Sequence, residues 1–300
     1  MSKTIAVSNT EKNLASEWFT ELRDTICEEF EKLEDSQNTG PFKNLSPGRF
    51  QQKHTKRKSS LIEDAGGGTM SIMRGGRLFE KVGVNISTVY GNLGKEAQNS
   101  ISGRRNIPGL DKDPRFWASG ISLVAHLRSP KVPAVHMNTR MFWTPFDWWF
   151  GGGTDLNPMV EIKKDTNFFH KILKLACDKH DKTFYPEYKK WADKYFMIKH
   201  WNEPRGVGGI FYDDHCTKDW SKDFEFTKDV GKAFLAAYIP LVEAHRNETW
   251  NKEDKEWQLV KRGKYTEFNL VYDRGTQFGL QTGHNPEAVL MSLPPEAKWP

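Results

Sequence analysis

Apolar and polar residues alternate along two neighbouring segments in the middle of the chain, residues 121–127 and 135–141. Successive side chains of a strand point to opposite faces of a sheet, so this alternation predicts two half-buried strands. One face would carry Ile121, Leu123, Ala125, Leu127, Val135, Met137, Thr139 and Met141. The other face would carry Ser122, Val124, His126, His136, Asn138 and Arg140. The second face is therefore a candidate polar site.

Residues 129–133, Ser-Pro-Lys-Val-Pro, are typical of a chain reversal between these two strands. Pairing that is symmetric about Lys131 predicts the opposed pairs His126–His136, Val124–Asn138 and Ser122–Arg140. Directly opposed side chains lie about 5 Å apart, so two imidazoles, an amide, a hydroxyl and a guanidinium would share one patch. A half-exposed antiparallel sheet with a solvated face would show the same alternation.

The next segment combines aromatic residues, glycines and a carboxylate. Residues 148–150 are Trp-Trp-Phe, and Gly151 to Gly153 precede Thr154 and Asp155. This order predicts an aromatic wall beside a flexible backbone turn, where glycine permits close approach to a ligand. Neither this triplet nor residues 66–68 has the sequence of a phosphate loop. Asp155 could act as a base, accept hydrogen bonds from a ligand, or cap a turn.

Hydrophobic spacing predicts the remaining elements. Helical spacing occurs near residues 11–35, 169–176, 188–196 and 226–241. Strand patterns occur at residues 71–74, 79–90, 207–213, 267–273, 278–282 and 288–293. Strands cluster instead of alternating strictly with helices, which favours an α+β fold with a large, mainly antiparallel β-sheet covered by α-helices.

Residues 37–60 form a polar stretch that contains the basic run Lys53 to Lys58. They are expected to form a loop or extended arm, most simply a solvated surface. We therefore expect residues 1–60 to be an N-terminal helix and polar arm packed on the main domain, and residues 61–300 to be one α+β catalytic domain.

Composition narrows the class of protein. Aromatic residues make up 13% of the chain, which excludes a disordered protein. The formal charge of +5 favours an anionic partner only weakly, because both signs are interspersed. A protein that binds nucleic acid through the basic arm is a competing functional class. Cys27, Cys177 and Cys216 are scattered, and neither a signal peptide nor a run of eighteen apolar residues is present, so a cytoplasmic protein without a membrane segment is expected.

Four histidines, His126, His136, His170 and His200, are the candidate metal ligands, although no pair has the spacing of a known metal motif. A hydrogen-bonded structural role is the alternative for each of them. Arg140 could grip a carboxylate with two N–H groups. Asp273 and Arg274 follow a predicted strand and would lie at a sheet edge. A metal-dependent oxygenase that uses His126, His136 and a carboxylate is one function that these residues permit.

Five long segments carry a resemblance to a known family. They are Gly75–Ser87 (GGRLFEKVGVNIS), Phe116–Arg140 (FWASGISLVAHLRSPKVPAVHMNTR), Trp148–Pro158 (WWFGGGTDLNP), Tyr195–Asp214 (YFMIKHWNEPRGVGGIFYDD) and Gly263–Gly283 (GKYTEFNLVYDRGTQFGLQTG). Together they closely resemble the oxygen-dependent coproporphyrinogen III oxidases. The resemblance covers most of the chain from about Gly66 onward and is weaker for the N-terminal helix and the basic arm.

The resemblance implies a flat antiparallel sheet sandwiched between helices, a cleft between sheet and helices, and a homodimer. It implies a reaction in which two propionates of coproporphyrinogen III become vinyl groups, giving protoporphyrinogen IX, carbon dioxide and hydrogen peroxide in haem biosynthesis. Oxygen would be the co-substrate, with no organic cofactor such as flavin or haem. Some members are assigned a divalent metal such as manganese, and the need for it is disputed within the family.

Site residues also follow from the resemblance. Substrate contacts would come from Ser122, Asn138, Thr139, Arg140, Asp273, Arg274, Gly283, His284 and Asn285. His136 resembles the proton donor, while Asp155 and Arg140 match residues proposed for catalysis, with Asp155 holding the pyrrole N–H groups. The metal in some members would fall on His126, His136, His170 and His200. The stretch from about Tyr238 to Asp273 resembles the dimerisation region.

The chain departs from the family pattern near its end. Many members have Gly-Gly-Arg where this chain has Gly283, His284 and Asn285, so the expected arginine is absent. The sequence also stops at Pro300, where other members continue into a tail.

Overall fold

A seven-stranded sheet forms the centre of the molecule in the computed structural model, which describes residues 7–57, 65–281 and 285–300. The strand order is β1-β2-β3-β4-β5-β6-β9, and all six pairings are antiparallel. The strands are β1 (Gln51–Lys56), β2 (Gly66–Arg74), β3 (Phe79–Asn92), β4 (Arg115–Leu127), β5 (Ala134–Trp143), β6 (Trp148–Asn157) and β9 (Gly209–His215). The short strands β7 (Met197–Ile198) and β8 (Glu203–Pro204) pair separately.

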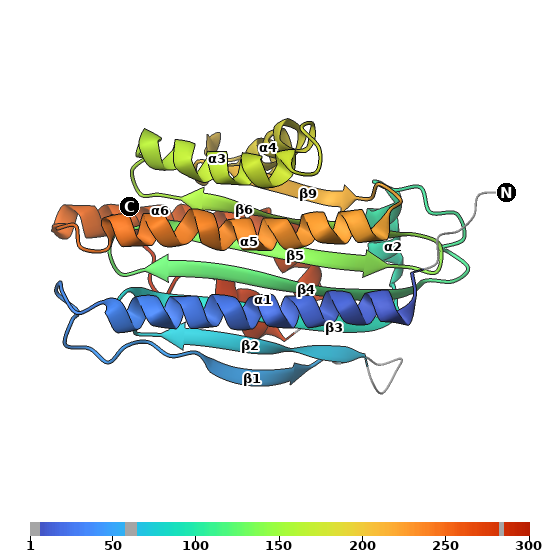
Figure 1. Cartoon of the computed structure of the whole chain (residues 1–300), viewed down its shortest axis with the longest axis horizontal. Helices are drawn as coiled ribbons and strands as arrows, with labels where there is room; N and C mark the ends of the chain where they lie inside the picture. Colours follow the sequence, from blue (N-terminus) through green and yellow to red (C-terminus); the bar gives the residue numbers. More distant parts are fainter. Residues whose placement is uncertain (1–6, 58–64, 282–284) are drawn as a thin grey trace.

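Helices lie on both sides of this sheet (Figure 1). They are α1 (Asn9–Ser36), α2 (Lys95–Ser102), α3 (Lys163–Asp178), α4 (Phe184–Tyr195), α5 (Trp220–His245), α6 (Lys252–Val271), α7 (Arg274–Gln281), α8 (Pro286–Val289) and the 3-10 turn η1 (Leu290–Ser292). The predicted α+β class, with a mainly antiparallel sheet between helices, is confirmed. None of the helices in the described ranges is long and apolar enough to cross a membrane.

The two faces of the sheet have different roles. We call the face under α1 and α5 the front face, as in Figure 1, and the opposite face the rear face. The front face carries the apolar set of β4 and β5, including Leu123 and Met137, which are fully buried. Aromatic rings such as Phe30 and Phe79, stacked with centroids 4.6 Å apart, join α1 to the sheet. This side of the sheet is therefore the main hydrophobic core.

The first 60 residues contribute to the same sheet and core. Helix α1 begins with a capping box between Ser8 and Glu11, which satisfies free N–H groups of its first turn. Residues 51–56 were expected in a loop or extended arm, but they form the edge strand β1, paired with β2 and mostly exposed. The tip of that arm, residues 58–60, lies outside the described residues. The division at residue 60 remains a prediction.

The hairpin of β4 and β5 has the predicted faces but not the predicted register. His136 lies opposite Val124 and Asn138 opposite Ser122, while Arg140 lies opposite Gly120. The predicted pairs were therefore wrong by two residues, because the pairing is symmetric about Pro130 and not about Lys131. A shift of two leaves every side chain on its face, since the side-chain period of a strand is two.

The glycine triplet is not a flexible turn. Residues 151–153 lie inside β6, a strand whose residues are all buried. Trp148, Trp149 and Phe150 are likewise core residues and do not form a ligand wall. A strand covered on both faces shows no alternation of apolar and polar residues, which is why its sequence did not indicate a strand.

The predicted C-terminal strands are helices. Residues 267–271 belong to α6, residues 278–281 to α7, and residues 288–292 to α8 and η1, while Thr282 lies outside the described residues. Apolar and polar residues alternate by chance over short stretches near Phe268 and Leu280. Over the full length of α6, however, the buried residues recur at helical intervals. Asp273, Arg274 and Gly275 therefore lie at the junction of α6 and α7 and not at a sheet edge.

Candidate active site

The candidate site lies on the rear face of β4, β5, β6 and β9. The sheet register forms three adjacent rows there: Val124–His136–Asp155, Ser122–Asn138–Gly153 and Gly120–Arg140–Gly151. His136, Asn138 and Arg140 are each partly exposed, although their neighbours on the front face are buried. The prediction that these side chains share one face of the hairpin is confirmed.

Hydrogen bonds join the three β5 side chains into one chain. Arg140 Nη1 donates to Asn138 Oδ1 over 3.0 Å, and Asn138 Nδ2 lies 3.0 Å from His136 Nε2. Because a guanidinium can only donate, Asn138 must present its oxygen to Arg140 and its NH₂ group to His136. His136 Nε2 is then an acceptor, so Nδ1 carries the proton and donates to Asp155 Oδ1 at 2.8 Å. The network thus fixes the tautomer of His136.

Asp155 is fully buried and all of its hydrogen-bonding positions are used. Arg205 donates from Nε to Oδ2 over 2.9 Å and from Nη2 to Oδ1 over 2.7 Å, and Asn157 Nδ2 donates to Oδ2 over 3.0 Å. Burial would raise the pKa of Asp155, but the charge of Arg205 and the hydrogen bond from His136 outweigh it, so the pKa lies well below its usual value. In this arrangement Asp155 orients His136 and is out of reach of a substrate.

Arg205 is enclosed by aromatic rings. Its guanidinium carbon lies 4.4 to 4.7 Å from the ring centroids of Phe196, Tyr265 and Phe268. Burial alone would lower the pKa of Arg205, but the charge of Asp155 raises it. The ion pair is therefore a fixed structural unit behind His136.

A second buried carboxylate, Asp213, lies at the other end of the chain of hydrogen bonds. Arg140 Nη2 donates to its Oδ1, Arg274 Nη2 donates to its Oδ2, and Arg104 Nη1 lies 3.0 Å from Oδ2. Burial would raise the pKa of Asp213, yet the three guanidiniums lower it. Arginine side chains from β5, from the start of α7 and from the turn after α2 are thereby brought together.

Glycines provide the space for this arrangement. A Cβ on Gly151 would lie 2.8 Å from the guanidinium carbon of Arg140, and a Cβ on Gly120 would lie 2.8 Å from Arg140 Cβ. Arg140 can therefore extend across β6 to Asp213 on β9. Because these glycines have no side chains, Arg140 can lie close against the rear face of the sheet.

The four candidate metal ligands are not brought together. His126 Nε2 lies 2.9 Å from the carbonyl oxygen of Ser292, and His170 Nε2 lies 3.0 Å from that of Val207. His200 contacts Glu267 and Tyr272 near the surface. Among the residues that the structure describes, no group of three or more His, Cys, Asp or Glu is placed to hold a metal ion. The arrangement does not fit a four-histidine site.

The other predicted substrate contacts differ in accessibility. Ser122 is partly exposed on the rear face beside Asn138, whereas the Thr139 side chain is fully buried on the front face and could offer only its backbone. Asp273 accepts hydrogen bonds from Tyr195 Oη and from Thr276, and so caps α7. Asn285 caps α8 through Glu287 N, while Gly283 and His284 lie outside the described residues.

Sequence analysis did not identify Arg104, Arg205 or Asp213 as site residues. Arg205 and Asp213 lie inside the segment Tyr195–Asp214. Asp213 ends the predicted strand 207–213, and a charge in an otherwise apolar strand was a signal that could have found it, whereas Arg205 precedes that strand. Arg104 lies in a polar turn, and its sequence offers no such signal.

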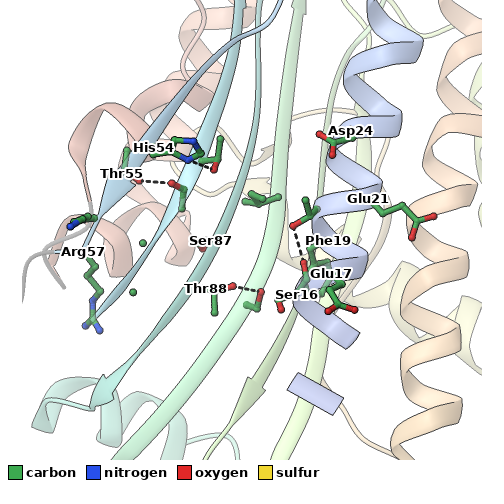
Figure 2. Close-up of a pocket in the computed structure, with 18 of the residues that line it drawn as sticks. Ser16, Glu17, Phe19, Glu21, Asp24, His54, Thr55, Arg57, Ser87 and Thr88 are labelled. Atoms are coloured by element: carbon green, nitrogen blue, oxygen red, sulfur yellow. Dashed lines mark hydrogen bonds between the residues drawn. The ribbon is translucent and has the colours of Figure 1, made fainter. Parts of the chain in front are cut away.

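A hollow on the front face of the sheet lies away from these residues. It has a volume of about 1300 Å³ and lies between α1 and strands β1 to β3. Figure 2 shows Glu17, Glu21 and Asp24 of α1 on one side and His54 and Arg57 on the other. Because Ser122, His136 and Arg140 point to the opposite face, this hollow does not belong to the candidate site.

Comparison with known proteins shows the family of the chain. The family model for coproporphyrinogen III oxidase matches residues 15–300, and the chain belongs to that family. Its relatives include proteins named oxygen-dependent coproporphyrinogen-III oxidase from Rickettsia bellii (strain RML369-C), Rickettsia conorii (strain ATCC VR-613 / Malish 7) and Rickettsia akari (strain Hartford). The first two are 51% identical and the third 50% identical over 288 residues, which is 96% of this chain and 98% of each relative.

Proposed function

We propose that this chain is an oxygen-dependent coproporphyrinogen III oxidase that acts in haem biosynthesis. The observation that carries the proposal is the hydrogen-bonded series His136–Asn138–Arg140 in a chain of this family. Asp155 fixes one end of the series, and Asp213 joins the other end to two further arginines. A tetracarboxylate macrocycle requires guanidinium groups for its propionates and a flat surface for its rings. The three partly exposed arginines around Asp213 offer the guanidinium groups.

The chemistry converts each of two propionate side chains to a vinyl group. The carboxylate leaves as carbon dioxide, and the neighbouring carbon loses hydrogen with its bonding electrons, a hydride equivalent. Oxygen accepts that equivalent and one proton to give hydrogen peroxide. Each round therefore consumes one oxygen molecule and one proton, and the protein must orient the propionate and supply the proton.

His136 is the proposed proton donor. In the resting network its Nε2 accepts from Asn138, and a proton added at Nε2 gives an imidazolium whose charge is stabilised by Asp155. Arg140 orients the reacting propionate, while Ser122 and Asn138 contact the substrate. Asp155 acts through His136, because its own oxygens accept hydrogen bonds from His136, Arg205 and Asn157.

No step of this proposal uses an organic cofactor or a metal. For the alternative, a His and carboxylate metal-dependent oxygenase, the described residues offer no group of three or more ligands. We expect protein treated with a chelator to retain turnover, and His136→Ala to lose it. Turnover that returns only on addition of manganese or another divalent ion would require a metal site instead.

A cytoplasmic homodimer is part of the proposal. Three apolar residues of α6, Trp257, Leu270 and Val271, are 44 to 51% exposed, and exposed apolar side chains can take part in a protein contact. They fall within the stretch Tyr238–Asp273 that was predicted to be the dimer region. The cytoplasmic location is supported by three free cysteines.

The direct test is incubation of the purified protein with coproporphyrinogen III in air, with products separated by chromatography. The proposal predicts protoporphyrinogen IX. Recovery of unchanged substrate from a folded protein would reject it.

A further inference from the structure

We propose that Arg104, Arg140 and Arg274 form one carboxylate-binding cluster around Asp213, in which Arg104 binds a substrate carboxylate other than the one that reacts. The inference rests on the proposed function and deepens it, because it assigns a group to a propionate that is retained during the step. Arg104 is the new member of the site.

The geometry of Asp213 shows that it organises the cluster. Its side chain is only 4% exposed, whereas those of Arg104, Arg140 and Arg274 are 31%, 36% and 45% exposed. Each guanidinium therefore contacts the buried carboxylate while its own side chain stays partly exposed. Such a fork binds carboxylates in two places.

The charges of the cluster favour an anion. Three guanidiniums contact Asp213. That of Arg104 also lies 3.8 Å from the carboxylate of Asp214. The three arginines outnumber the two carboxylates even when both carboxylates are ionised. At least one positive charge thus remains uncompensated within the cluster, in a partly buried place where attraction is less screened than at an open surface.

The turn that carries Arg104 is held in place by its neighbour. Arg105 forms an ion pair with Asp147, donates to the carbonyl oxygen of Asp214 over 3.1 Å, and lies 4.8 Å from the ring centroid of Trp149. Arg105 anchors the turn against β6 and β9, so Arg104 is directed at Asp213. Adjacent arginines therefore have different roles, one structural and one available for a ligand.

The order of contacts separates Arg104 from the reacting group. Arg140 joins His136 through Asn138 and contacts Asp213 Oδ1, while Arg104 reaches Oδ2 of the same carboxylate. Arg104 is thus on the far side of Asp213 from the proposed proton donor. Its loss is expected to weaken substrate binding and to leave the chemical step largely intact.

The test compares Arg104→Gln with Arg115→Gln, an arginine that is 64% exposed and pairs only with Asp113 among the described residues. Binding of coproporphyrinogen III is measured without oxygen, so that the substrate binds but does not react, and turnover is measured in air. For Arg104→Gln we expect KM and the anaerobic Kd to rise about tenfold, the scale of one charged hydrogen bond, and kcat to stay within about twofold. Arg115→Gln should match the wild type. Added salt should weaken wild-type binding more steeply than binding to Arg104→Gln.

The outcomes separate this inference from the proposed function. A wild-type enzyme that turns over, with Arg104→Gln binding equally tightly, would overturn the role of Arg104 alone. A fall in kcat at unchanged KM would also overturn it, because Arg104 would then act on the reacting group. A wild type without turnover would reject the proposed function, whatever the variants bind. Thermal unfolding of both variants shows whether each is folded.

Discussion

Asp155 and Arg205 form the buried pair on which the orientation of His136 depends. Two charges removed from water are costly, and the cost is offset only when geometry and hydrogen bonds are nearly complete. Here the carboxylate accepts from His136, Asn157 and two nitrogens of Arg205, and three rings enclose the guanidinium. A pair of this kind holds one geometry, which is what a positioned proton donor requires.

Asp155→Asn should therefore reduce both stability and activity. The amide cannot balance Arg205, and an unpaired buried charge typically costs about 3–5 kcal/mol of unfolding free energy. Loss of the fixed His136 tautomer should lower turnover by about 10²-fold, measured at a temperature where the variant is folded. Urea unfolding checks the first part. The double variant Asp155→Asn, Arg205→Gln should recover part of the stability but not the turnover. Wild-type stability in the single variant would contradict the account.

A substitution at Gly151 tests whether Arg140 needs the space that this glycine leaves. Gly151→Ala places a Cβ 2.8 Å from the Arg140 guanidinium carbon, so the guanidinium must move away from Asp213. We expect turnover to fall about tenfold, the scale of one lost charged hydrogen bond, with little change in unfolding temperature because the side chain is flexible at its end. Gly94→Ala is the matched control, since nothing lies within 4 Å of its added Cβ. Equal turnover of both variants would remove Gly151 from the explanation.

At the scale of elements, the β4 and β5 hairpin was predictable because its two faces differ. Leu123 and Met137 are buried in the front core, while Ser122, His136 and Arg140 remain partly exposed behind them, and a period of two records this difference. The partners of these residues were not predictable. The local sequence of Asp155, which follows three glycines, is typical of a turn. Its burial depends on β9 and α6, whose packing the local sequence does not indicate.

The contact between α3 and α5 should give a pH-dependent stability. His245 Nε2 lies 2.7 Å from Asp165 Oδ2, and Nδ1 lies 2.6 Å from Glu248 Oε1. Burial lowers the pKa of His245, but Glu248 and Asp165 outweigh it and the net pKa is raised.

A raised folded-state pKa means that the protonated form stabilises the fold. This contribution is fully present below the unfolded value of about 6.5 and is lost as the pH rises through the folded-state pKa. His245→Gln should thus lower the unfolding free energy by about 1 kcal/mol at pH 6, with a smaller difference at pH 9. Denaturant unfolding at both pH values measures it. A difference that grows with pH would show that the sign is wrong.

At the scale of the whole molecule, the site is assembled from distant parts of the chain. Arg104 follows α2, Asp213 is on β9, and Arg274 begins α7. The resemblance could indicate the substrate and several contacts because five motifs recur in order. It could not show that Asp155 is inaccessible or that Asp213 gathers three arginines, since both depend on packing between segments.

Assembly of two chains into a dimer is also a property of the whole molecule. Exposed Trp257, Leu270 and Val271 on α6 lead us to expect a symmetric homodimer that buries well over about 1,000 Å². Sedimentation at micromolar concentration should give twice the chain mass of 34.6 kDa. Leu270→Lys should weaken the dimer, and Leu175→Lys, at a 57% exposed position on α3, is the control. A fully active monomer at that concentration would contradict the expectation.

The most direct test of the account is the stoichiometry of the complete reaction. Oxygen uptake, carbon dioxide release and tetrapyrrole products are measured together for wild-type protein and coproporphyrinogen III. Two oxidative decarboxylations predict two molecules of oxygen consumed and two of carbon dioxide released for each protoporphyrinogen IX formed, with His136→Ala nearly inactive. Carbon dioxide release without oxygen uptake, or no turnover by the folded wild type, would contradict the account.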